Sequence, residues 1–76
     1  MFFVYVLQDG KTGKLYIGSC ENLTRRLQEH AKKRPGYKLI YKETRQMRSE
    51  AFKREMFFKT GNGRLVLKSL IASASI

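Results

Sequence analysis

The sequence has few of the residues that staple or ligate small domains. It contains one cysteine, Cys20, and one histidine, His30, among 76 residues. A single cysteine excludes a disulfide within the chain, and these two residues alone cannot form a four-ligand zinc site. A domain of this length has only a thin core, so its apolar residues must hold it together. We therefore expect a protein that folds without staples, as suits the reducing cytoplasm.

Long hydrophobic runs are also missing. The N-terminal apolar run from Phe2 to Leu7 has no basic segment before it and leads into the polar turn Gln8-Asp9-Gly10, unlike a signal peptide. Nothing approaches the roughly 20 apolar residues that span a bilayer. The sequence therefore predicts a soluble, cytoplasmic protein with no membrane attachment. Its length fits one domain, residues 1–76, and we take a monomer as the default.

Acidic residues are scarce. The chain has six Asp and Glu residues and 16 Lys and Arg residues, which gives a net charge of +10. The chain is 42% hydrophobic, too apolar for a disordered basic tail. This charge predicts an anionic partner, nucleic acid first, although it would also serve ribosome association or solubility. The residues expected to bind nucleic-acid phosphates are Arg25, Lys32, Lys33, Arg34, Lys53, Arg54 and Lys59.

The hydrophobic pattern predicts six elements in the order β-β-α-β-α-α. Two strands form a hairpin around Asp9-Gly10, and a third strand joins them after the first helix. The expected elements are strands at residues 2–7, 14–18 and 37–43 and helices at residues 23–33, 49–59 and from 64 onward. Asn22 and Ser49 are the expected helix caps, and Asn62 is expected in a glycine turn. The fold class is α+β, a three-stranded antiparallel sheet flanked by about three helices.

Glu55 stands out when the second helix is projected at about 100° per residue. It falls inside the arc that Ala51, Phe52 and Phe58 define. An unpaired carboxylate is costly to bury, so this position needs an explanation. One explanation is an ion pair, with Lys59 four residues later or with an arginine. The other is a carboxylate directed across the fold to hold a metal ion.

Three further residue types could belong to the same site. Arg26 and His30 are four residues apart and project together beside the apolar stripe of the first helix. Tyr5 and Tyr16 lie on neighbouring strands and share a face if the hairpin pairs them. Each has an ordinary structural alternative, because histidines beside a core and tyrosines in strands are commonly packing residues.

Taken together, these residues resemble the GIY-YIG nuclease family. The resemblance rests on Tyr5 in the first strand, the triplet Tyr16-Ile17-Gly18, Arg26 eight residues after Gly18, His30, and Glu55 in a later helix. It covers about residues 2–68 and is closest to small stand-alone members, which carry a segment like Lys59-Thr60-Gly61-x-Gly63-Arg64. The three-stranded sheet flanked by helices that the family implies agrees with the pattern above.

The resemblance implies a metal-dependent endonuclease that hydrolyses DNA, as relatives do in repair and recombination. It implies that Glu55 holds one Mg²⁺ or Mn²⁺ ion and that Tyr5 or Tyr16 activates the attacking water, with Arg26 as a phosphate clamp. His30 is implied as a further proton acceptor or donor. A protein partner that delivers the substrate is also implied for small members. The alternative is a basic nucleic-acid-binding module with weak or no catalysis.

Overall fold

The computed structural model describes residues 1–74 of the chain. Its elements are β1 (Phe2–Asp9), β2 (Leu15–Cys20), α1 (Leu23–Lys33), β3 (Tyr37–Arg45), α2 (Arg48–Phe58) and α3 (Gly61–Ala74). The predicted element order and fold class are confirmed. Within residues 1–74, no helix has the length and apolar character needed to cross a bilayer.

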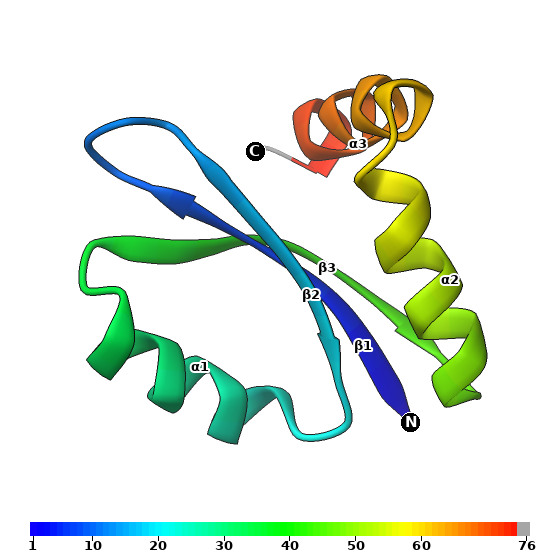
Figure 1. Ribbon diagram of the computed structural model, residues 1–76, viewed down its shortest axis with the longest axis horizontal. Coiled ribbons are helices and arrows are strands. Elements are labelled where there is room, and N and C mark those ends of the chain that lie inside the picture. Colours follow the sequence, from blue (N-terminus) through cyan, green and yellow to red (C-terminus); the bar gives the residue numbers. More distant parts are fainter. Residues whose placement is uncertain (75–76) are drawn as a thin grey trace.

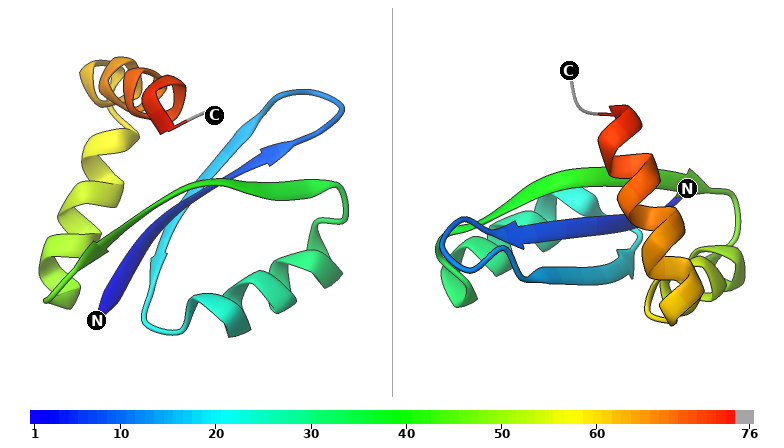
Figure 2. Two further views of the ribbon diagram at one scale, coloured as in Figure 1. Left: turned by 180° about the vertical axis from the view of Figure 1, so that it is seen from behind. Right: turned by 90° about the horizontal axis from the view of Figure 1, so that it is seen from above.

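The sheet is antiparallel with strand order β2-β1-β3, so β1 is central and β2 is an edge strand. Helix α1 covers one face, and α2 and α3 cover the other (Figures 1 and 2). Because both faces are covered, residues 4–7 of β1 are all fully buried instead of alternating between core and solvent.

Alternation along the strands divides the core in two. Val4, Val6 and Ile17 face α2 and α3, where they pack with Ala51, Phe58 and Leu67. Tyr5, Leu7 and Cys20 face α1 and pack with Leu23. The sheet thus separates side chains of α1 from those of α2, and the two sets can meet only around an edge.

The helix starts agree in part with the prediction. Asn22 caps α1 as expected, because its side-chain oxygen accepts a hydrogen bond from the Arg25 backbone N–H at 3.0 Å. Ser49 as the cap of the second helix was wrong. The cap is Met47, whose backbone N–H donates to the Glu50 carboxylate at 3.2 Å, and Ser49 lies inside the first turn.

Helix α3 starts three residues earlier than expected, at Gly61. Thr60 joins it to α2, because its hydroxyl donates to the Phe57 carbonyl at 2.7 Å and accepts from the Gly63 N–H at 3.0 Å. The cap that Thr60 supplies makes the glycine segment helical. Asn62 therefore lies in the first turn of α3, and its assignment to a glycine turn was wrong.

Candidate functional site at the edge of the sheet

A hollow of about 450 Å³ lies along the edge strand β2, and we call it the edge pocket. Residues from both faces of the sheet line it. Tyr5, Tyr16 and Arg26 come from the α1 side, and Ser19 and Glu55 come from the α2 side. The remaining lining residues are Leu15, Ile17, Gly18, Lys59 and Arg64. The pocket thus collects four of the five predicted catalytic residues, three cations and one carboxylate.

Gly18 allows Tyr5 to reach this edge from the central strand. The two residues are paired across β1 and β2, and the Tyr5 ring lies against the Gly18 backbone. A Cβ atom at position 18 would lie 2.5 Å from the Tyr5 hydroxyl oxygen and 2.6 Å from Cζ. Only glycine therefore leaves room for the phenol to cross β2.

We expect Gly18→Ala to move the Tyr5 hydroxyl out of place and to lower any activity that depends on it by about 10²-fold, the scale typical of a 1 Å misplacement. The measurements are kcat on a cleavable substrate and the thermal midpoint. Gly10→Ala is the matched control, because a Cβ atom there meets only the Gly36 carbonyl at an ordinary 3.5 Å. Equal kcat values for the two variants would show that the position of the Tyr5 hydroxyl does not matter.

The Tyr5 side chain is 1% exposed, and its hydroxyl oxygen lies 2.9 Å from His30 Nε2. Burial raises the pKa of Tyr5 to about 12, and Tyr16 adds to this. The Arg26 guanidinium opposes the shift without cancelling it. At neutral pH Tyr5 is therefore a neutral phenol. Two groups beside it, His30 and Arg26, can donate hydrogen bonds that would stabilise its phenolate.

His30 lies behind Tyr5 instead of lining the edge pocket. Burial and the nearby Arg34 guanidinium lower its pKa, so its imidazole is neutral at physiological pH. An Arg34 nitrogen lies 3.1 Å from His30 Nδ1. Because a guanidinium can only donate, Nδ1 accepts and the ring proton is on Nε2. His30 therefore donates a hydrogen bond to the Tyr5 oxygen.

Tyr16 completes an aromatic cluster over this network. Its ring stacks with Tyr5 at 6.4 Å between centroids and meets His30 edge-on at 4.8 Å. Arg34 lies 4.4 Å from the centre of the Tyr16 ring. Arg34 was expected to bind nucleic-acid phosphates, and in the structure its guanidinium contacts Tyr16 and His30.

Glu55 reaches the pocket from α2. Its Oε1 accepts from the Ser19 hydroxyl at 2.7 Å, and its Oε2 pairs with Lys59 Nζ at 2.7 Å. The carboxylate is half-buried between Ala51 and Phe58 on the sheet side of α2, with 13% of the side chain exposed. The apolar arc is narrower than expected, because Phe52 is 53% exposed. The ion pair with Lys59, one of the two explanations from the sequence, is present.

The donor set fits only certain ions. No group of three His, Cys, Asp or Glu residues within residues 1–74 could hold a metal. Among the residues that line the edge pocket, Glu55 is the one carboxylate. Magnesium takes one or two carboxylates and keeps several waters, so the residues present fit Mg²⁺ or Mn²⁺ and do not fit zinc.

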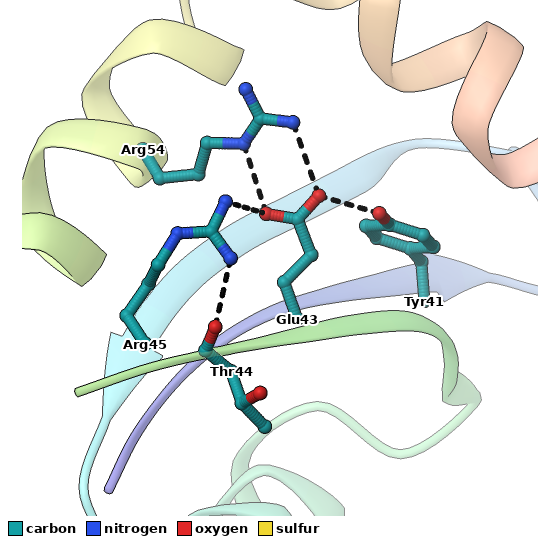
Figure 3. Close-up of polar contacts among 5 residues, drawn as sticks. All are labelled: Tyr41, Glu43, Thr44, Arg45 and Arg54. Atoms are coloured by element: carbon teal, nitrogen blue, oxygen red, sulfur yellow. Dashed lines mark hydrogen bonds and ion pairs between the residues drawn. The ribbon is translucent and has the colours of Figure 1, made fainter.

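Arg54 does not line the edge pocket and holds α2 to β3, the edge strand opposite β2 (Figure 3). It donates to Glu43 on β3 from Nε at 2.9 Å and from a terminal nitrogen at 3.2 Å. Arg45 and the Tyr41 hydroxyl donate to the same carboxylate. Burial alone would raise the pKa of Glu43, but the bonds from Arg54 and Tyr41 outweigh it and lower the pKa. Arg54, which was expected to bind nucleic-acid phosphates, is thus engaged with Glu43 in the structure.

The Glu43 cluster has a consequence for the site. Consecutive residues of α2, Arg54 and Glu55, are tied to the two outer strands β3 and β2. Two anchors on opposite edges fix the rotation of the helix about its own axis. The partly buried ion pair at Glu43 therefore holds the Glu55 carboxylate where it meets the edge pocket.

The other basic residues differ in how they are placed. Arg25, Lys32, Lys33 and Lys53 are exposed as expected, with Arg25 beside Glu29 at 3.5 Å, and Lys59 is held by Glu55. Ser19 and Arg64 line the pocket but were not among the predicted site residues. Their positions directly after Gly18 and Gly63, in two of the motifs singled out in the sequence, were the signal that could have revealed them.

Comparisons with known proteins gave a family-model match and a similar solved structure. The family model of the GIY-YIG catalytic domain matches residues 1–65. A search of curated proteins gave no match. Among solved structures, the chain is similar to the solution NMR structure of the UPF0213 protein from Bacillus halodurans, with 26% identity and a TM-score of 0.60. That similarity covers 92% of this chain and 85% of the other.

Proposed function

The chain belongs to the GIY-YIG catalytic-domain family, and on that premise we propose that it is a metal-dependent DNA endonuclease. The observation that carries the proposal is the edge pocket, where Glu55 and the Tyr5 phenol meet around β2 among three cations. Phosphodiester hydrolysis needs a base that deprotonates the attacking water and cations that bind the phosphate oxygens. It also needs groups that stabilise the negative charge developing in the transition state. The pocket offers candidates for each.

In this proposal Tyr5 is the base. Its phenolate takes a proton from the attacking water, and hydrogen bonds from His30 and the charge of Arg26 favour that phenolate. Arg34 acts through His30, because it keeps the ring proton on the nitrogen that faces Tyr5. His30 is then a positioning residue for Tyr5, a narrower role than the proton acceptor that the family resemblance implied.

The cations around the pocket bind the substrate. Arg26, with its planar fork of donors, suits two phosphate oxygens at once, and Arg64 adds a second guanidinium across the pocket. Tyr16 also lines the pocket. The exposed residues Arg25, Lys32, Lys33 and Lys53 extend the positive surface along the DNA backbone and position it without reading sequence.

GIY-YIG nucleases generally depend on a divalent ion, and here Glu55 would hold it together with water. A divalent ion bound there would stabilise negative charge on the phosphate and on the leaving oxygen. Lys59 neutralises the same carboxylate in the structure, so its ammonium must move or share Glu55 when an ion binds. Ser19 holds the other carboxylate oxygen and keeps Glu55 directed at the pocket.

A base with a pKa of about 12 predicts a characteristic pH dependence. The phenolate fraction grows with pH throughout the range below that value, so kcat/KM should rise about tenfold per unit between pH 7 and pH 9. The measurement is kcat/KM at constant ionic strength, with DNA binding followed over the same range as the control. A plateau below pH 8 would contradict Tyr5 as the base and favour a group that titrates near neutrality.

The second candidate is a basic nucleic-acid-binding module without efficient catalysis. One observation favours it, namely that Lys59 pairs with Glu55 at 2.7 Å, where a structural ion pair would account for the carboxylate. This candidate predicts binding that weakens steeply with salt and no metal-dependent product.

The test is cleavage of labelled duplex, single-stranded and branched DNA, and of matching RNA, with Mg²⁺, with Mn²⁺ and with EDTA. A Glu55→Gln protein purified in parallel controls for contaminating nuclease. Metal-dependent cleavage that the variant lacks supports the nuclease, and the panel identifies its substrate. Binding at low salt without cleavage of any substrate would refute the nuclease and leave the binding module.

A further inference from the structure

A second hollow, of about 600 Å³, lies between the β1–β2 hairpin and α3, and we call it the hairpin hollow. Its floor is apolar, formed by Leu15, Ile40 and Ile71, which are only partly buried. Its rim is basic, formed by Lys14, Arg64 and Lys68. None of its lining residues is acidic. An apolar floor inside a cationic rim suits a flat, uncharged group attached to an anion.

The hairpin hollow adjoins the edge pocket. Leu15 and Arg64 line both, so the two form one continuous surface over the start of β2 and the start of α3. A phosphate held by Arg64 would therefore belong at once to a ligand in the edge pocket and to one in the hairpin hollow. Each nucleotide of a nucleic acid carries this combination, a phosphate and a flat base.

We propose that the hairpin hollow binds an unpaired DNA base next to the bond that the edge pocket cleaves. The proposal rests on the proposed function, since it names the class of substrate for that site. A base inside a duplex is stacked on both faces and cannot reach an apolar floor, whereas an unpaired or extruded base can. The substrate is accordingly DNA with unpaired nucleotides beside the scissile phosphate, as in gaps, flaps and branches.

The rim explains how such a strand is held. Lys14 on the hairpin and Lys68 on α3 are exposed and stand on the two elements that border the hollow. They can take the phosphates on either side of the bound base, while Leu15, Ile40 and Ile71 cover its face. Contacts of apolar side chains with a base face do not distinguish one base from another. The hollow therefore selects DNA structure and not sequence.

The test is Ala72→Glu, which places a carboxylate at an exposed position in the lining of the hollow, four residues after Lys68. Ser69→Glu is the matched control, because it adds the same charge at an exposed position of α3 outside the hollow. Binding of two labelled duplexes, one fully paired and one with a three-nucleotide gap, is measured by fluorescence anisotropy in EDTA. A 2-aminopurine in the gap reports whether the base leaves water.

The native protein should bind the gapped DNA about tenfold more tightly than the paired DNA, a difference of about 1.4 kcal/mol. Ala72→Glu should reduce that preference to below threefold and abolish the 2-aminopurine response, and Ser69→Glu should retain both. Equal effects of the two variants, or no preference in the native protein, would overturn the inference.

The same oligonucleotides separate this inference from the proposed function. Cleavage with Mg²⁺ that shows no dependence on the gap or on Ala72→Glu leaves the nuclease standing and removes the hollow as a base site. Selective binding of the gapped DNA that Ala72→Glu abolishes, without cleavage, retains the hollow and removes the nuclease.

Discussion

Glu55→Gln is expected to lower the cleavage rate by at least about 10³-fold, because an amide is a poor ligand for Mg²⁺ and the loss of metal stabilisation is worth several kcal/mol. Folding should be nearly unchanged. The glutamine can still accept from Ser19, and the ion pair that it loses, with 44% of the Lys59 side chain exposed, contributes little. DNA binding should stay within about threefold of the native value, since removing a negative charge does not weaken attraction to phosphate.

The control for this experiment is Glu29→Gln, the same change in an exposed i,i+4 ion pair, with Arg25 on α1. It should leave cleavage, binding and the thermal midpoint unchanged. The measurements are single-turnover rates, DNA affinity and thermal unfolding for all three proteins. A Glu55→Gln rate within tenfold of the native rate would show that Glu55 is not the metal ligand, and its contacts with Ser19 and Lys59 would then be its whole role.

The elements of this fold were predictable because residues close together in the sequence determine each of them. Short-range signals mark them: apolar residues alternate along the strands, Asp9-Gly10 marks the hairpin, and Asn22 marks the start of α1. The errors lie at the starts of α2 and α3, where the capping contact involves a residue other than the one that the sequence pattern favoured. Met47 caps α2 because Glu50 bonds to its backbone, and Thr60 makes the glycine segment helical by linking two helices.

The candidate site was predictable as a set of residues but not as an arrangement. Side chains of Tyr5 and Glu55 start on opposite faces of the sheet, and no projection of one helix or strand brings them together. They meet because β2 is an edge strand and Gly18 leaves its surface open. Strand order and a close backbone approach are properties of the whole fold.

Charged residues were the least predictable part, because the sequence does not show which groups the guanidinium of a long arginine side chain will contact. Arg34 and Arg54 were both assigned to the phosphate-binding surface with their lysine neighbours. In the structure Arg34 lies on Tyr16 and Arg54 is held by Glu43. Both shape the site from inside, one by orienting His30 and the other by fixing the rotation of α2.

Gly63→Ala is expected to destabilise the fold by about 3 kcal/mol or more, the upper range for added volume in a packed interior. A Cβ atom at position 63 would lie 1.7 Å from the Phe57 carbonyl oxygen and 2.5 Å from its carbon. These are backbone atoms, so no rotamer change relieves the contact. The carbonyl cannot move freely either, because it accepts from both the N–H and the hydroxyl of Thr60. Relief requires α2 and α3 to separate, which opens the core around Phe58 and Leu67.

For a chain this small the total stability is on the order of 4–11 kcal/mol, so the change removes a large part of it. The thermal midpoint should fall by more than about 10 °C. Gly61→Ala is the control, two residues earlier in the same helix, where a Cβ atom meets nothing within 4 Å, and it should be neutral or slightly stabilising. Thermal and denaturant unfolding of both variants make the comparison. If Gly63→Ala unfolds within 3 °C of the native protein, the turn between α2 and α3 must be able to open, and the start of α3, which brings Arg64 to the edge pocket, would then not be rigidly joined to α2.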